Sequence, residues 1–202
     1  MKNWIYASAL SLATGAALAV ASVGQPAPSF SATDVSGKAV SLADFKGKHV
    51  VLEWVNPGCP YVVKHYGSAN MQGTQREATA KGVVWLAINS TAVDHQDYRN
   101  PAALSQWMQG QKAAASATLM DVDGKLGRAY GARTTPHMYI VDPAGTLIYA
   151  GGIDNKPSSN PADIPSATNH VKVALAEALA GKPVTQATTR PYGCSVKYAG
   201  QG

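Results

Sequence analysis

The chain has 202 residues, of which 46% are hydrophobic, and a formal net charge of +5. This length and apolar content allow one well-formed core but hardly two full domains, so we expect a single domain. The Lys and Arg residues are scattered along the chain rather than clustered, which argues against a nucleic-acid partner.

The N-terminal residues are typical of a targeting segment. Lys2 is followed by a long stretch without charge, and residues 5–20 are rich in Ala and Leu. This pattern predicts a secretory signal peptide at residues 1–21 that is removed in the mature protein. The alternative is an uncleaved membrane anchor, because residues 4–23 are just long enough to span a bilayer. Their many small residues make them weakly apolar, so we expect an exported protein with no stable membrane association after cleavage.

The remainder of the chain alternates between strand-like and helix-like patterns. In chain order we first expect a β-hairpin turning at residues 36–38, a buried strand at 50–55, a broken helix at 60–81 and a buried strand at 83–88. A helix from Pro101, a strand at 117–120 and a turn at 121–124 should follow. The last elements are a hairpin turning at 142–145, a loop at 153–166 and a helix that stops at Gly181. Such alternation predicts an α/β fold whose central sheet has helices on both faces. The sheet should be parallel in its first half and closed by an antiparallel hairpin.

Cys59 lies between the predicted strand at residues 50–55 and the helix that follows. Pro60 suits the first turn of that helix, where a missing N–H costs nothing. A thiol at such a turn faces the unpaired N–H groups of the helix, which favour the thiolate and create a nucleophile. A small buried cysteine that only packs is the alternative. The glycine and two prolines around Cys59 favour a tight turn, and we expect Glu53, the nearest acid in sequence, to point elsewhere.

Three stretches of the chain resemble the redoxin branch of the thioredoxin superfamily, which includes the alkyl hydroperoxide reductase/thiol-specific antioxidant family. They are residues 24–30 with 42 and 46–48, the turn at 54–60, and residues 134–142. The Asn-x-x-Cys-Pro turn and the Tyr-Gly-Cys-Ser sequence around Cys194 are similar to those of a bacterial subgroup. The resemblance implies a thioredoxin-like fold, a central mixed sheet flanked by helices with an N-terminal β-hairpin. We expect a redoxin domain at residues 22–182, a tail at residues 183–202, and a location in the bacterial periplasm.

The resemblance also implies a role for Thr135 and Pro136. In thioredoxin-like folds the proline at this position is cis and lies beside the catalytic cysteine. An ordered cis bond would expose backbone groups that can pair with an extended substrate. The alternative is a trans proline that opens an edge strand, but the other motifs favour the cis form.

The chain departs from the thioredoxin pattern and from the peroxiredoxin pattern. Val62 occupies the position at which thioredoxins have a second cysteine, so no local dithiol can form. Asn56 and Pro136 stand where peroxiredoxins have a threonine and an activating arginine, so the peroxide-activating cluster is not intact. Arg133 is a substitute candidate for holding the thiolate, and a solvated surface charge is the alternative.

These residues lead to a first hypothesis, an exported thiol oxidoreductase with antioxidant or thiol-disulfide exchange activity. Cys59 attacks a peroxide or a disulfide sulfur at a rate set by its thiolate fraction and accessibility. Cys194 then resolves the sulfenic acid or mixed disulfide, and an external thiol reductant reopens the Cys59–Cys194 bridge. Backbone N–H groups at Tyr61 and the next residue hold the thiolate, and Asn56 positions the turn or donates to an oxygen. This mechanism needs no metal or cofactor.

Two other hypotheses remain open. A copper-handling protein needs soft ligands brought together, and His65, His95, His137 and His170 form no helix-spaced pair, although His65 is near Cys59. A non-catalytic redoxin module would use the Cys59–Cys194 bridge only for stability, worth about 5 kcal/mol for a loop of more than 100 residues on the chain-entropy model. Within the first hypothesis, a strict thiol peroxidase is less favoured than disulfide exchange, because donors that would stabilise O–O cleavage are missing.

Overall fold

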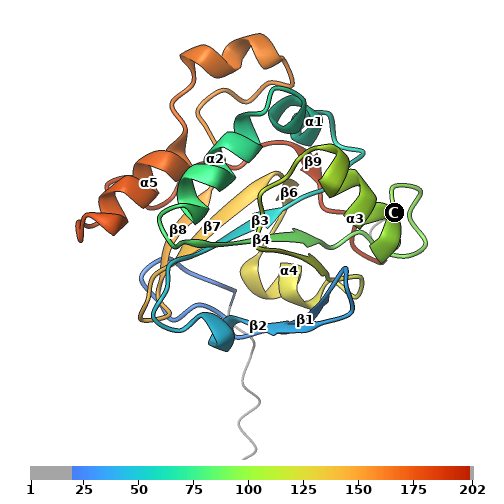
Figure 1. Cartoon of the computed structure of the whole chain (residues 1–202), viewed down its shortest axis with the longest axis horizontal. Helices are drawn as coiled ribbons and strands as arrows, with labels where there is room; N and C mark the ends of the chain where they lie inside the picture. Colours follow the sequence, from blue (N-terminus) through green and yellow to red (C-terminus); the bar gives the residue numbers. More distant parts are fainter. Residues whose placement is uncertain (1–19, 201–202) are drawn as a thin grey trace, which may run out of the picture.

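Seven strands form one hydrogen-bonded sheet in the order β2-β1-β5-β4-β3-β7-β8 (Figure 1). The structure is a computed structural model and describes residues 20–200, so the predicted signal peptide at residues 1–21 lies almost entirely outside the described residues. The strands are β1 (Ser31–Asp34), β2 (Ala39–Ser41), β3 (Val50–Trp54), β4 (Val84–Asn89), β5 (Ala117–Met120), β7 (His137–Val141) and β8 (Leu147–Gly151).

The centre of the sheet is parallel and its outer parts are antiparallel. Strand β4 runs parallel to both β3 and β5, whereas β7 is antiparallel to β3 and to β8. All residues of β3, β4 and β7 are buried, which explains their nearly unbroken apolar runs. The N-terminal hairpin of β1 and β2 joins the sheet through β5. This arrangement confirms the predicted fold class.

The predicted helices form, and the one expected to be broken is interrupted. The broken helix is two helices, α1 (Pro60–Gly67) and α2 (Asn70–Thr79), separated at Ala69, whose backbone is left-handed. Helix α3 (Pro101–Gly110) begins after Asn100, whose side chain accepts from the Ala103 N–H at 2.9 Å. Helix α5 (His170–Leu179) has the same kind of asparagine cap. Each side chain satisfies an N–H that the helix itself leaves unpaired.

Three short helical segments were not predicted. They are η1 (Leu42–Phe45), α4 (Lys125–Tyr130) and η2 (Pro161–Ser166), the last within the stretch expected to be a loop. Helix α4 is held at its start by Asp121, whose carboxylate accepts from the N–H groups of Leu126 at 3.0 Å and Gly127 at 2.8 Å. A six-residue helix with a glycine inside it has too little periodicity to be recognised from sequence.

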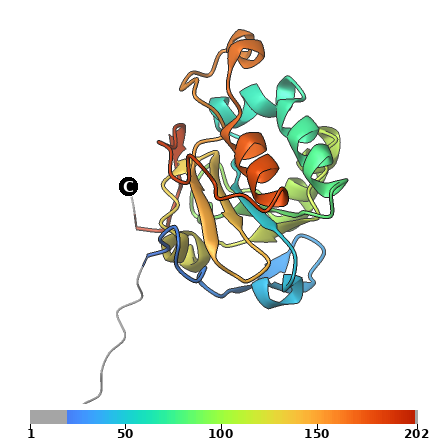
Figure 2. The same cartoon turned by 90° about the vertical axis from the view of Figure 1, so that its left-hand side faces the viewer.

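Two hydrophobic cores cover the two faces of the sheet. On one face, Val51 and Val55 pack with side chains of α1, α2 and α5. On the other face, Val50, Leu52 and Trp54 pack with α4. Figure 2 shows α1, α2 and α5 together on one side of the sheet and α4 on the other. The period-two alternation of β3 thus decides which side chains lie beneath α1.

The predicted tail packs against the rest of the protein over its described part. Its strand β9 (Cys194–Ser195) pairs antiparallel with β6 (Thr134–Thr135) (Figure 1). Before β9, the Ala187 carbonyl accepts from the N–H of Ala150 in β8 at 3.0 Å. After β9, Tyr198 is buried and donates its hydroxyl to the Ala132 carbonyl at 2.8 Å. The segment around Cys194 is therefore attached on both sides.

Over residues 20–200, none of the helices combines the length and the apolar character needed to cross a membrane.

Candidate active site

Cys59 lies at the junction between the carboxyl end of β3 and the start of α1. It is the N-cap residue of α1, with extended backbone angles, and Pro60 occupies the first turn as predicted. The Cys59 N–H donates to the Asn56 carbonyl at 3.0 Å, which closes the turn. Cys59 is only 1% exposed. A reaction partner must therefore be small, or the segment that covers the thiol must move.

Asn56 shapes this turn with its side chain. Its Oδ1 accepts from the Gly58 N–H at 2.9 Å, and its Nδ2 donates to Asp97 Oδ2 at 3.2 Å. Asp97 belongs to the segment between β4 and α3, and its carboxylate lies so close to Gly58 that a Cβ there would be 3.0 Å from Asp97 Cγ. Asn56 therefore joins the cysteine turn to a neighbouring loop.

Thr135 links the two cysteines. The bond between Thr135 and Pro136 is cis, as the resemblance implies. The Cys59 thiol donates to the Thr135 carbonyl at 3.0 Å, while Cys194 is the strand partner of the same residue across β6 and β9. Cys59 and Cys194 are 135 positions apart in sequence, yet both contact the backbone of Thr135.

The two thiols interact directly and are not equivalent. Both cysteines are free thiols. Burial, followed by a hydrogen bond and charge interaction with Cys59, raises the pKa of the Cys194 thiol to about 12. Cys194 is therefore protonated near neutral pH and is a poor first nucleophile.

Gly193 allows the tail to approach this closely. Its φ of +134° lies in the region that favours glycine, and a Cβ at this position would overlap the Thr135 carbonyl oxygen. The glycine at position 193 is thus required by the contact of the tail with β6.

The contacts expected from Tyr61 and Arg133 to the Cys59 sulfur are not made, and the exposure of Arg133 fits its alternative as a solvated surface charge. No hydrogen bond from the first turn of α1 reaches the Cys59 side chain, because the thiol is donating to Thr135 instead. The Tyr61 ring lies edge-on to that of Tyr192, with centroids 5.8 Å apart. Arg133 is exposed, and its guanidinium makes no hydrogen bond with either cysteine. The contact of Arg133 with the tail is through its backbone carbonyl, which accepts from the Val196 N–H at 3.0 Å.

Glu53, the acid nearest to Cys59 in sequence, forms its hydrogen bonds with residues other than the two cysteines. Glu53 is wholly buried on the face of β3 that packs with Cys59, where its carboxylate accepts from Tyr66 at 2.8 Å, Trp85 at 2.7 Å and Gln75 at 3.0 Å. Burial raises its pKa to about 7, against the effect of these hydrogen bonds. Strand alternation could have revealed this placement, because Glu53 shares its parity with Val51 and Val55.

His65, the histidine near Cys59, is used in packing and hydrogen bonds. Its Nδ1 lies 2.8 Å from Asn70 Nδ2, and its Nε2 lies 3.1 Å from the Tyr192 hydroxyl. Burial lowers the pKa of His65 to about 4, so the ring is neutral at physiological pH. Among the described residues, no group of three or more His, Cys, Asp or Glu side chains is arranged to hold a metal ion.

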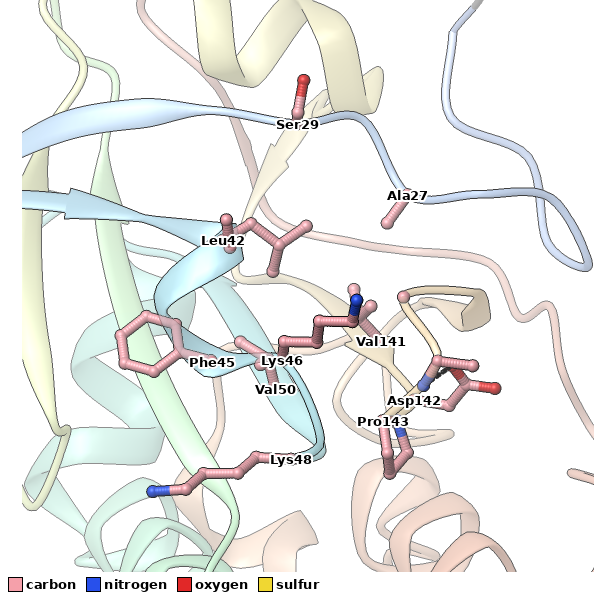
Figure 3. A pocket seen from close by; sticks show the side chains of 13 residues that line it. Ala27, Ser29, Leu42, Phe45, Lys46, Lys48, Val50, Val141, Asp142 and Pro143 are labelled. Atoms are coloured by element: carbon pink, nitrogen blue, oxygen red, sulfur yellow. Dashed lines mark hydrogen bonds between the residues drawn. The ribbon is translucent and has the colours of Figure 1, made fainter.

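A separate cavity of about 220 Å³ lies at the other end of the sheet (Figure 3). Leu42, Val50 and Val141 line it, and the ammonium group of Lys48 points away from it. Because Val50 begins β3 and Cys59 follows the end of that strand, the cavity and the cysteines lie at opposite ends of β3. This cavity is therefore not part of the thiol site.

Comparison with known families covers the part of the chain that contains Cys59. Residues 23–150 match the profile of the AhpC/TSA family. The chain belongs to the AhpC/TSA family. Among its relatives is the thiol-disulfide oxidoreductase ResA of Bacillus thuringiensis, which is 26% identical over 133 residues covering 62% of this chain and 67% of the relative.

Solved structures support the same fold for this AhpC/TSA-family chain. An uncharacterised conserved protein from Geobacillus kaustophilus is 26% identical, with a TM-score of 0.74 and coverage of 90% of this chain and 94% of that one. A hypothetical protein from Sinorhizobium meliloti has a TM-score of 0.75 at 22% identity, covering 89% and 96% of the two chains. The thioredoxin domain of a thiol-disulfide oxidoreductase from Bacteroides vulgatus has a TM-score of 0.52 at 22% identity, covering 72% and 96%. The fold is thioredoxin-like, as predicted.

Proposed function

We propose that this AhpC/TSA-family chain is an exported thiol-disulfide oxidoreductase in which Cys59 is the nucleophile and Cys194 the resolving thiol. The observation that supports this most directly is the arrangement at Thr135, which accepts a hydrogen bond from the Cys59 thiol and has Cys194 as its strand partner. The name of the ResA relative supports the reaction class. The proposed partners are a disulfide-containing or peroxide substrate and an external thiol reductant.

The reaction with a disulfide substrate consists of two exchanges. The Cys59 thiolate attacks one substrate sulfur, the substrate S–S bond breaks, and the leaving thiolate takes up a proton. Cys194 then loses its proton and attacks the Cys59 sulfur, which releases the second substrate thiol and forms the Cys59–Cys194 bridge. The substrate gains two electrons and two protons, and the external reductant later returns both to the protein.

Two serine variants and peptide mapping test the roles. After oxidation of wild type, mapping under non-reducing conditions should recover one peptide pair joined through Cys59 and Cys194. Cys59→Ser should lose thiol-dependent turnover, whereas Cys194→Ser should keep the first step and accumulate a mixed disulfide. Equal loss of first-step reactivity in both variants would show that the roles are wrongly assigned.

The redox potential of the Cys59–Cys194 pair distinguishes a working bridge from a purely structural one. Structural disulfides of exported proteins lie below about −300 mV, and working ones lie higher. We expect the Cys59–Cys194 couple above about −300 mV when it is equilibrated with dithiothreitol or glutathione buffers. A lower value would favour the non-catalytic alternative.

The proposal of export to the periplasm rests on the sequence of residues 1–21. Expression in a Gram-negative host, followed by fractionation and N-terminal sequencing, tests it. A mature N-terminus near residue 22 in the periplasmic fraction is the expected result. An intact N-terminus in the membrane fraction would favour the anchor instead.

A further inference from the structure

Tyr192, two residues before Cys194, is enclosed by one face of α1. Three α1 residues with helical spacing contact it: Tyr61 ring to ring at 5.8 Å, Lys64 with its Nζ 5.7 Å from the ring centroid, and His65 through Nε2 at 3.1 Å from the hydroxyl. Residues at such spacing share one side of a helix. The helix that begins at Cys59 thus also binds the segment that contains Cys194.

The Tyr192 hydroxyl belongs to a directed chain of buried hydrogen bonds. It donates to Asp154 Oδ1 at 2.5 Å, so it can only accept from His65 Nε2. With its proton on Nε2, His65 accepts at Nδ1 from Asn70 Nδ2 at 2.8 Å. The His65 and Asp154 side chains are 0% and 1% exposed. We call the chain from Asn70 through His65 and Tyr192 to Asp154 the Tyr192 network.

We infer that Tyr192 is a positioning residue that holds Cys194 against Cys59 for the closing step. This inference rests on the proposed function. The Tyr192 network fixes the tail just before Cys194, and the backbone pairing of Val196 with Arg133 fixes it just after. When the second thiol is held in place, the tail does not have to diffuse before Cys194 can attack. Such preorganisation accelerates a step between two tethered groups. The first exchange, between Cys59 and a separate molecule, gains nothing from Tyr192.

The two steps can be measured in one experiment on the full-length protein. Reduced protein is mixed with oxidised glutathione, quenched at intervals with an alkylating reagent, and analysed by mass spectrometry for reduced, mixed-disulfide and bridged forms. For Tyr192→Phe, which keeps the ring but removes the hydroxyl, we expect closure to be about tenfold slower, the effect of losing one good hydrogen bond. The first step should stay within about twofold of wild type.

Two further variants separate positioning from general stability. Asp154→Asn keeps an acceptor for the Tyr192 hydroxyl, so its closure rate should lie between those of wild type and Tyr192→Phe. Tyr130→Phe removes another tyrosine hydroxyl, one that donates to the Pro28 carbonyl at 2.8 Å and not to a residue of the tail, and should close at the wild-type rate. Wild-type closure in Tyr192→Phe, or equal slowing in Tyr130→Phe, would overturn the inference. A wild-type protein that never forms the bridge would instead overturn the proposed function.

Discussion

Glu53 is a carboxyl group in an unusual position, beneath the helices that follow Cys59. Its pKa rises from 4.5 to about 7 because burial disfavours the charge. Folded Glu53 therefore binds its proton more tightly than the unfolded chain does. Its favourable contribution to the free energy of unfolding is complete below about pH 4.5 and is lost as the pH rises to about 7, a difference on the order of 3 kcal/mol.

Glu53→Gln should remove this pH dependence. The Gln side chain can accept from Trp85 and Gln75 through its oxygen and donate to the Tyr66 hydroxyl through its nitrogen. We expect the variant to match wild type within about 1 kcal/mol at pH 4.5 and to be the more stable protein at pH 8. Urea unfolding across this range measures the difference.

The control for this series is Glu77→Gln, which removes a surface carboxylate 2.8 Å from Lys172. Exposed pairs of this kind contribute about 0–1 kcal/mol, so this variant should retain the wild-type pH profile. A Glu53→Gln protein that still loses stability between pH 4.5 and 7 would assign the effect to another group.

Gly193→Ala should interfere with the docking of β9. The new Cβ would overlap the Thr135 carbonyl oxygen, so the strand pairing has to open. We expect faster amide exchange at Val196 and much slower closure of the disulfide. Gly200→Ala is the matched control in the same tail, because Gly200 also has a positive φ but its Cβ would meet nothing within 4 Å. Similar behaviour of the two variants would mean that backbone strain alone is responsible.

At the scale of elements, the tail acts as part of the core rather than as an appendage. Tyr192, Val196 and Tyr198 are all at least nine-tenths buried. Burying a side chain of this size contributes about 1.5–3 kcal/mol. Deletion of residues 190–202 should therefore lower the free energy of unfolding by several kcal/mol, as measured by chemical denaturation at 25 °C.

The same deletion should make Cys59 much more reactive towards iodoacetamide, because the tail helps to bury it. Cys194→Ser is the control, since it removes the second thiol but keeps the tail in place. If alkylation of Cys59 is equally fast in both variants, the tail does not limit access to the thiol.

Local signals explain which elements were predictable. Strand β3 and the turn at Cys59 are defined by neighbouring residues, and the asparagine cap of α3 is visible in its own sequence. The pairing of β6 with β9 could not be predicted from sequence, because each strand has only two residues and the partners are about 60 positions apart. Helix α4 was missed because its six residues, with a glycine among them, carry too little periodicity.

The residues of the candidate site also divide into those that a local motif reveals and those that only the tertiary fold brings together. Cys59, Asn56 and Pro136 belong to short motifs, so they could be named as candidates from the residues and the resemblance. Asp154 had no such signal, since it becomes a partner of Tyr192 only through packing between separate segments. A buried polar contact of this kind depends on the tertiary fold.

At the scale of the whole molecule, a Cys59–Cys194 bridge would join positions separated by 135 residues. Closing so long a loop restricts the unfolded chain and should stabilise the oxidised protein by up to about 5 kcal/mol on the chain-entropy model. Guanidinium unfolding of the oxidised and reduced forms measures the gain. Cys194→Ser should unfold identically under both conditions, and identical unfolding of the two wild-type forms would contradict the expected bridge.

Two of the protein's four tryptophans are buried on opposite faces of the sheet. Trp85 lies on the face of Cys59 and donates its indole N–H to Glu53 at 2.7 Å, whereas Trp54 lies on the opposite face and donates to the Ser90 hydroxyl at 3.0 Å. Ionisation of Glu53 changes the charge beside one indole and leaves the other among tyrosine rings. The emission of Trp85 is therefore a built-in optical reporter of protonation beneath the thiol site, with Trp54 as its internal reference.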